Sequence, residues 1–266
     1  LGILDEFLRV CAENGLCYYA AWGTLLGAAR HQGFIPWDDD IDVWMPARDY
    51  YRFRELCLSG CLRPGFYFQS HASTPENYLS WQRIGVSNST SVQRKYAAIR
   101  ADSGVCMDIF PLMPAPADKR ARGAFLKKAR SLSRLADRSV FRIEAKSATG
   151  FRKAYYWLMG HYPRILNEKI WGWAEARTVV NESLDLSDSV CDLWWFGEKR
   201  WFVGDRALSF EGRQLCVPMC YEEVLDSLYG TDWWMIPPEE KRVQHSGGGN
   251  DRVIVSLDTS YKELWK

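Results

Sequence analysis

Two apolar stretches of this chain carry acidic residues at positions where a buried β-strand is expected. Residues 40–45 alternate carboxylates with apolar side chains, and residues 105–110 are apolar apart from Asp108. Because side chains two positions apart on a strand share a face, Asp40 and Asp42 project together while the residues between them point into the core. The chain must therefore fold around a sheet that gathers carboxylates at one edge of its core.

These carboxylates predict a binding site for a divalent cation. Carboxylates this close repel one another and raise each other's pKa, so the arrangement is unfavourable unless a cation binds them. Oxygen ligands at this spacing suit Mg²⁺ or Mn²⁺, with phosphate oxygens completing the coordination shell. Asp38 extends the same row, and Asp108, a buried acid that needs a partner, supplies a third carboxylate. The competing interpretation is a solvated acidic turn, which the apolar neighbours of Asp40 and Asp42 disfavour.

A short turn upstream of the carboxylates is a candidate phosphate site. Gly23 and Thr24 follow an apolar run at residues 16–22 and precede a small-residue helical stretch at 25–30. Backbone N–H groups at the start of a helix, together with the helix dipole, bind phosphate oxygens. Arg30 and His31 lie between this turn and the carboxylates, so they are candidates to contact the leaving group. The alternatives are an ordinary helix N-cap at Thr24 and two end-of-helix cations.

The rest of the chain mixes helices and strands. We predict further helices at residues 3–11, ended by Asn14-Gly15, and at 50–57 and 222–229, with strands at 66–69, 78–86, 200–203 and 208–217. Residues 118–183 are expected to be helical. The sequence thus predicts an α+β fold with a mixed sheet flanked by helices. We expect a core with the metal and phosphate site at 1–116, a helical lobe at 117–190, and a C-terminal segment at 191–266 that returns to the core.

Charge and apolar patterning limit the classes of partner. The chain has 34 Lys and Arg against 33 Asp and Glu, for a net charge of +1, so no nucleic-acid partner is expected. No apolar run reaches the length of a membrane span. The basic helical segment, with eight Lys and Arg between Lys119 and Arg138, is a solvated surface or a site of peripheral membrane association or of binding to a phosphate-rich polymer.

Cysteine usage indicates a reducing compartment. Eight Cys in 266 residues are too few for a disulfide scaffold, so we expect a cytoplasmic protein, with peripheral association at the inner membrane face left open. The chain begins at Leu1 inside a helical pattern, so a targeting segment outside this numbering also stays open. A zinc site with His161 or His245 competes with buried free thiols, which are the simpler interpretation. The cysteines concerned are Cys57, Cys61, Cys216 and Cys220.

The residues singled out above resemble the LicD/fukutin group of phosphotransferases, which belongs to the nucleotidyltransferase superfamily with a polymerase-β-type fold. The resemblance rests on the following segments: Gly23-Thr24-Leu25-Leu26-Gly27, Arg30-His31-x-Gly33-Phe34-Ile35-Pro36-Trp37-Asp38-Asp39-Asp40-Ile41-Asp42, Asp108-Ile109-Phe110-Pro111, Phe210-Glu211-Gly212, Pro218 and Tyr229-Gly230. The second segment is long and specific, whereas the C-terminal ones are individually weak.

The resemblance assigns roles to several of these residues. It implies a nucleotidyltransferase-like mixed sheet in which Asp40 and Asp42 are the metal-binding pair, Asp108 is the third carboxylate, and Gly23-Thr24 is the phosphate-binding turn. One position departs from the family pattern. Where the family has Lys, this chain has Arg83, which keeps the charge but changes the geometry of phosphate contact.

The resemblance also implies an activity. Members of the group move a phosphorylated alcohol, such as phosphocholine or ribitol phosphate, from a CDP-activated donor to a sugar hydroxyl. We expect Mg²⁺-dependent transfer of phosphocholine from CDP-choline to a hydroxyl of a cell-surface glycan or teichoic-acid-type sugar precursor, with release of CMP. Asp108, or a carboxylate beside it, is then the proton acceptor for the sugar hydroxyl.

Choline is the favoured donor alcohol because of the supply of aromatic residues. A quaternary ammonium donates no hydrogen bond, but aromatic rings attract it by cation–π interaction. Four Trp residues lie near the turn, the carboxylates and Arg83 in sequence, and they are the candidate contacts: Trp22, Trp37, Trp44 and Trp81. The alternative is that these rings pack in the core.

Three other functions compete with this one. The donor is alternatively another CDP-activated alcohol such as CDP-ribitol or CDP-glycerol. A nucleotidyltransferase that releases pyrophosphate from a nucleoside triphosphate would use the same carboxylates, and the leaving group distinguishes it. A non-catalytic lectin-like or scaffolding module would give the carboxylate cluster no role.

Overall fold

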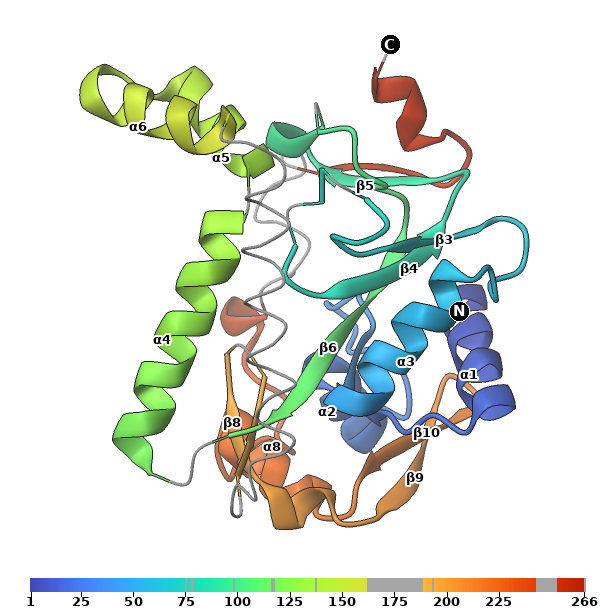
Figure 1. Ribbon diagram of the computed structural model, residues 1–266. Coiled ribbons are helices and arrows are strands. Elements are labelled where there is room, and N and C mark those ends of the chain that lie inside the picture. The colour runs from blue at the N-terminus through green and yellow to red at the C-terminus, as the bar shows by residue number, and fades with distance from the viewer. Residues whose placement is uncertain are drawn as a thin grey trace.

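A mixed sheet forms the centre of the molecule. The computed structural model describes residues 1–161, 189–242 and 253–265, apart from the single positions 75, 78, 98, 116, 117, 137 and 193. Helices pack around the sheet, and the α4, α5 and α6 helices run along one side of the molecule (Figure 1). The predicted α+β fold, with a mixed sheet and flanking helices, is confirmed.

The described helices are α1 (Gly2–Asn14), α2 (Trp22–His31), α3 (Ala47–Leu58), α4 (Lys119–Ala136), α5 (Arg138–Ser147), α6 (Gly150–His161) and α8 (Tyr221–Tyr229). The described strands are β1 (Tyr19–Ala20), β2 (Asp42–Pro46), β3 (Phe66–Gln69), β4 (Gln82–Val86), β5 (Thr90–Gln93), β6 (Cys106–Pro114), β7 (Ser189–Cys191), β8 (Phe196–Glu198), β9 (Asp205–Phe210), β10 (Arg213–Pro218) and β11 (Val253–Ser256). Short 3₁₀ helices occupy Arg94–Tyr96, Lys199–Phe202, Glu239–Lys241 and Tyr261–Trp265.

The order of strands in the sheet brings distant acidic and basic residues together. The main path is β1-β2-β6-β4-β3, in which β2 and β6 are parallel and the other pairs are antiparallel. The register pairs Asp42 of β2 with Asp108 of β6, and Asp108 in turn with Arg83 of β4. Three residues separated by up to 66 positions in the sequence therefore lie side by side across adjacent strands.

The core is built from the apolar faces of α1, α2 and α3 against this sheet. In α1, the residues at helical spacing are buried, including Leu4, Phe7 and Val10, and the helix ends at Gly15 in the left-handed conformation (φ 60°). Helix α3 lies against β2 and β6, whereas α2 contacts β2, the β9–β10 hairpin and α8. Helix α2 thus lies between the sheet and the C-terminal part of the chain.

A buried hydrogen-bond cluster attaches the segment after β7 to the sheet. Asp192 is fully buried and accepts hydrogen bonds from Trp44 Nε1 (2.7 Å) and from the backbone N–H groups of Trp194 (2.7 Å) and Trp195 (2.8 Å). Burial raises the pKa of this carboxyl to about 6, although the three donors oppose the shift. The Trp195 ring also stacks on Trp44 at 5.2 Å, so both contacts fix the position of the chain around Trp194.

Several element boundaries differ from the sequence-based expectation. The strand expected at 16–22 is reduced to Tyr19–Ala20, and α2 begins at Trp22, which places Gly23 and Thr24 in its first turn. The strand expected at 40–45 begins only at Asp42, and the one expected at 78–86 begins at Gln82. The strand expected at 200–203 is wrong, because Lys199–Phe202 form a 3₁₀ helix. Residues 162–183 of the expected helical region lie outside the described residues.

The remaining expectations concern the hairpin, the last helix and membrane spans. The apolar segment 208–217 forms the β9–β10 hairpin, and α8 ends at Gly230 as predicted. Within the described parts of the chain, no helix combines the length and the apolar character needed to cross a membrane.

Candidate active site

One cavity of about 940 Å³ lies between the carboxylate edge of the sheet, the start of α2 and the segment after α8. Its lining is divided between acids and aromatic rings, with two cations. The acids are Asp38, Asp40, Asp42, Asp108 and Asp232, the main aromatic residues are Trp22, Trp37, Trp81, Phe110, Trp194, Tyr229 and Trp233, and the cations are Arg30 and Lys241. All three carboxylates predicted as the metal site therefore face the same space.

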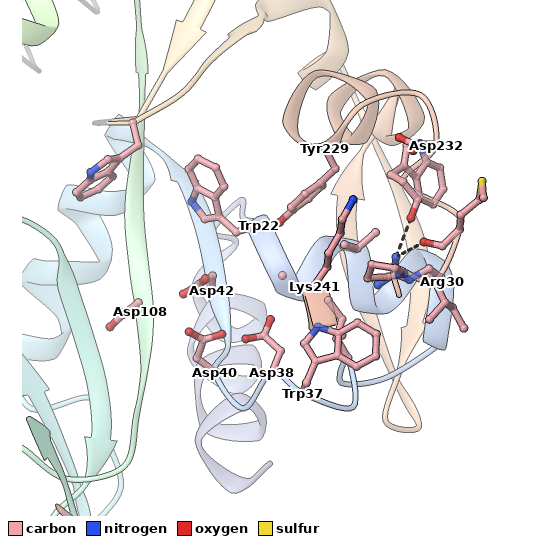
Figure 2. Close-up of a pocket in the computed structure, with 18 of the residues that line it drawn as sticks. Trp22, Arg30, Trp37, Asp38, Asp40, Asp42, Asp108, Tyr229, Asp232 and Lys241 are labelled. Carbon is pink, nitrogen blue, oxygen red and sulfur yellow. Dashed lines mark hydrogen bonds between the residues drawn. The ribbon is translucent and has the colours of Figure 1, made fainter. Parts of the chain in front are cut away.

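The backbone at the start of β2 positions the carboxylates. Asp42 opens the strand and lies opposite Asp108, whereas Asp40 belongs to the loop that enters the strand. Figure 2 shows the carboxylates of Asp38, Asp40 and Asp42 gathered on one side of the cavity, with Asp108 beside them. Asp38 was predicted only as an extension of the row, and it lines the same cavity.

The electrostatics of the cluster are dominated by Asp42. Its pKa lies well above the ordinary value, first because the carboxyl is buried and then because of the charges on Asp40, Asp108 and Asp38. Arg83 opposes this shift. The site therefore has more negative charge than its own cations neutralise, which makes the binding of an added cation favourable.

Arg83 pairs with Asp108 in the geometry of a guanidinium fork. Its Nε donates to Asp108 Oδ1, and its Nη2 donates to Oδ2 at 3.0 Å. Arg83 was predicted to contact phosphate, but it is not part of the cavity lining. The departure from Lys at this position thus has a structural consequence, because only Arg can make this two-point contact with a carboxylate.

The residues fit a divalent cation by their chemistry. Carboxylate oxygens are the ligands that Mg²⁺ and Mn²⁺ prefer, and Asp40 and Asp42 offer them in a cavity with an excess of negative charge. Among the residues that the structure describes, no three His, Cys, Asp or Glu side chains are already arranged as a complete metal site. Asp108 is bound through both oxygens to Arg83, so only its remaining lone pairs are available to a cation while that contact is in place.

The start of α2 lies close to the Asp38 carboxylate and is hydrogen-bonded to β2. Gly23 lines the cavity, and a Cβ at this position would collide with the Asp38 carboxylate, so a larger residue would displace that carboxylate. Thr24 is buried, and its hydroxyl accepts a hydrogen bond from the Asp42 backbone N–H at 2.8 Å. The Thr24 side chain therefore positions the start of β2, and the backbone N–H groups of the first turn of α2 are suited to a phosphate.

The predicted tryptophans have different surroundings. Trp22 lines the cavity and has a left-handed backbone (φ 44°), a conformation that costs about 1–3 kcal/mol in a bulky residue. Trp37 and Trp81 also line the cavity. The Arg242 guanidinium lies 5.0 Å from the centre of the Trp37 ring. The expectation for Trp44 is wrong. Its side chain is fully buried and donates to Asp192, so it is a core residue.

Arg30 and His31 are bonded within the protein. Arg30 lines the cavity, and its Nη1 donates to the backbone oxygens of Trp233 (2.8 Å) and Met235 (3.0 Å), as Figure 2 shows. His31 lies outside the lining, its Nε2 is 3.0 Å from Arg30 Nε, and burial and the Arg30 charge lower its pKa. Arg30 therefore holds the wall formed after α8, and the structure does not place His31 against a ligand in this cavity.

Sequence reasoning missed the residues that the C-terminal part contributes. Trp194, Tyr229, Trp233 and Lys241 all line the cavity. Burial and the nearby carboxylates raise the pKa of Tyr229, so its hydroxyl remains a hydrogen-bond donor. The available signal was the clustering of Trp at 194–195 and 233–234, but nothing in the sequence shows which element these pairs lie against.

Comparisons with known proteins relate the chain to one family. The family LicD/FKTN/FKRP, nucleotidyltransferase domain, matches residues 15–130, which include Gly23, Asp40, Asp42 and Asp108. The chain is 29% identical over 251 residues to the lipopolysaccharide cholinephosphotransferase LicD of Haemophilus influenzae, and the match covers 92% of each protein. A 54-residue segment is 46% identical to an uncharacterized protein of Rickettsia typhi, covering 20% of this chain and 18% of that protein.

We predict that Asp42→Asn stabilises the protein in the absence of divalent cations. Removing one charge relieves its repulsion with Asp40 and Asp108, and a gain of about 1 kcal/mol raises the Tm of a chain this size by roughly 2–4 °C. Added Mg²⁺ should raise the Tm of the wild type but not that of the variant. Thermal unfolding with and without Mg²⁺ measures both effects, and Asp226→Asn, at an exposed carboxyl of α8, is the control. Equal Mg²⁺ stabilisation of wild type and D42N would contradict the assignment.

We also predict that Arg30→Met loosens the wall after α8. The variant loses two hydrogen bonds to backbone oxygens, each worth about 1 kcal/mol, so amide hydrogen exchange across residues 231–236 should accelerate by about tenfold or more. Arg206→Met, which removes an exposed guanidinium from β9, is the matched control and should leave this exchange unchanged. Unaltered exchange in R30M would show that Arg30 does not hold the segment.

Proposed function

We propose that the chain transfers phosphocholine from CDP-choline to a hydroxyl of a cell-surface glycan or teichoic-acid-type sugar, releasing CMP, because residues 15–130 match the LicD/FKTN/FKRP nucleotidyltransferase domain and the chain is similar to a LicD cholinephosphotransferase over 92% of its length. The observation that carries this proposal is the cavity, which combines the Asp40, Asp42 and Asp108 carboxylates with the first turn of α2 and an aromatic wall. The named relative from Haemophilus influenzae is a cholinephosphotransferase, which favours choline as the transferred alcohol.

The cation would be held by Asp40 and Asp42, and when bound it neutralises the phosphates of the donor and stabilises the CMP leaving group. The protein supplies further phosphate contacts of its own. Gly23 lies in the first turn of α2 and lines the cavity, and the backbone N–H groups of a first helical turn, together with the helix dipole, favour a phosphate oxygen. Lys241 lines the same cavity, and within the described part of the chain its ammonium forms no ion pair with a carboxylate. These groups would bind and orient the diphosphate of the donor.

Asp108 is the proposed proton acceptor. Arg83 fixes the orientation of its carboxylate through one hydrogen bond to each oxygen, and an ionised carboxylate keeps further lone pairs for other donors. The carboxylate lines the cavity, so an acceptor hydroxyl that enters it could donate its proton there. The sugar oxygen then attacks the choline-bearing phosphorus, the bond from that phosphorus to the CMP oxygen breaks, and the negative charge leaves with CMP.

Aromatic rings that suit the trimethylammonium group of choline line the same cavity as Asp108. Trp81, Phe110 and Trp194 all line the cavity, and their ring centres lie 5.3–5.8 Å apart in tilted and edge-on contacts. Trp194 is 49% exposed, so part of its ring surface is open to a ligand. Because aromatic faces attract quaternary ammonium groups, this wall is the proposed binding surface for choline and would disfavour an uncharged polyol.

The central experiment is a donor panel. We expect the protein with Mg²⁺ and a glycan acceptor to release CMP from CDP-choline with a higher kcat/KM than from CDP-ethanolamine, CDP-ribitol or CDP-glycerol, and to release no pyrophosphate from nucleoside triphosphates. Asp40→Asn and Asp42→Asn should each abolish CMP release, whereas Asp226→Asn should not. A polyol donor preferred by about tenfold or more would overturn the choline assignment, and pyrophosphate release would establish nucleotidyl transfer instead.

The aromatic wall is tested by Trp194→Leu. Loss of one ring should lower kcat/KM for CDP-choline by about 2- to 30-fold while leaving the value for CDP-glycerol nearly unchanged, which corresponds to about 0.5–2 kcal/mol of cation–π attraction. The matched control is Trp234→Leu. Trp234 follows the cavity-lining Trp233 in sequence, but it is 63% exposed and does not line the cavity. Equal losses for both donors would assign Trp194 to packing.

A further inference from the structure

The helices α4, α5 and α6 concentrate positive charge on one part of the molecule. Residues 118–161 contain twelve Lys and Arg against three Asp and Glu, a net charge of +9, whereas all other residues together carry −8. Exposed basic side chains with described positions occur on each helix: Arg120, Lys127, Lys128, Lys146, Arg152 and Lys153. The near-neutral charge of the whole chain thus hides a strong separation of charge.

Helix α6 presents apolar side chains on its outer face. Phe151, Tyr155 and Leu158 follow at spacings of four and three residues, which places them on one face, and they are 87%, 43% and 62% exposed. The neighbouring Trp157 is 58% exposed and stacks on His161. We call Phe151, Tyr155 and Leu158 the α6 stripe. Large apolar side chains exposed together mark an interaction surface.

The stripe is fixed in place by the opposite side of the helix. Gly160 of α6 lies against α5, where Arg142 Nε donates to the Gly160 oxygen at 2.9 Å. Arg142 Nη1 and the Ser139 hydroxyl also donate to Glu76, which ties the α5–α6 pair to the loop before β4. Helical spacing places Phe151, Tyr155 and Leu158 on the side of α6 opposite Gly160, and α6 itself lies at the outer end of the molecule (Figure 1).

The combination of apolar and basic groups on α4–α6 indicates which kind of partner would bind there. A second copy of this chain is disfavoured, because two surfaces of net charge +9 would repel. A polyanion would satisfy the bases but leave the stripe in water. An anionic lipid surface satisfies both, since Trp, Tyr, Phe and Leu enter the headgroup boundary while flanking Lys and Arg contact anionic headgroups.

We propose that the α6 stripe and the basic side chains of α4–α6 form a docking surface for an anionic lipid bilayer, on which the protein rests without spanning it. Arg152 and Lys153 of α6 are both exposed, and long basic side chains of this kind reach headgroups while apolar side chains lie deeper. This proposal is independent of the reaction that the cavity catalyses, because it rests on residues outside the cavity lining.

The test is flotation of the whole chain with lipid vesicles. At about 0.1 M salt, we expect binding to vesicles of phosphatidylcholine with about one third phosphatidylglycerol, little binding to pure phosphatidylcholine, and weaker binding at about 0.5 M salt. The double variant Phe151→Ser/Leu158→Ser should bind at least about tenfold more weakly, since each side chain contributes apolar burial. Lys127→Glu/Lys128→Glu should also weaken binding.

Two matched variants separate the docking surface from general effects. Val203→Ser/Leu257→Ser removes exposed apolar side chains elsewhere, and Arg48→Glu/Arg52→Glu reverses exposed charges on α3; both should bind vesicles as the wild type does. Circular dichroism confirms that each variant is folded. Absence of wild-type binding to the anionic vesicles overturns the proposal, and so does unchanged binding of the stripe variant. If the stripe variant binds vesicles and heparin as the wild type does, the surface is a polyanion site instead.

Discussion

Asp42 and Asp108 lie opposite each other on neighbouring parallel strands. Much of the surrounding structure offsets the repulsion between these two carboxylates. Burial and the nearby acids raise the pKa of Asp42, while Arg83, on the next strand, binds Asp108 through both carboxylate oxygens. Two carboxylates held this close can remain ionised only with positive charge beside them. The Arg83 guanidinium supplies positive charge to Asp108 from within the sheet. Positive charge for Asp42 is left to what binds in the cavity.

Helix α2 connects this electrostatic centre to the remainder of the cavity. Thr24 bonds the backbone of the strand that carries Asp42, Gly23 leaves room for the Asp38 carboxylate, and Arg30 at the other end of the helix holds the segment after α8. One ten-residue helix thus sets the position of the carboxylates relative to the segment after α8 that lines the other side of the cavity. A displacement of α2 would alter both sides of the cavity together.

The acidic cavity and the basic helices α4–α6 are built from different elements. The cavity gathers five Asp carboxylates, whereas residues 118–161 carry a net charge of +9. Placing them on different elements allows each to have the sign of charge that its proposed ligand requires.

The sequence by itself determined the α+β class, the limits of helix α1 and the end of α8, and it singled out Asp40, Asp42, Asp108 and Gly23. It could do so because an acid inside an apolar strand needs a positive partner, and a glycine at the start of a helix permits close approach. Local pattern could not show that Arg83 faces Asp108, that Trp44 is buried on Asp192, or that Trp194, Tyr229 and Lys241 complete the cavity. Those facts follow from strand order and from the return of the C-terminal part. Contacts between residues far apart in sequence are set by packing of the whole chain, which tertiary structure alone decides.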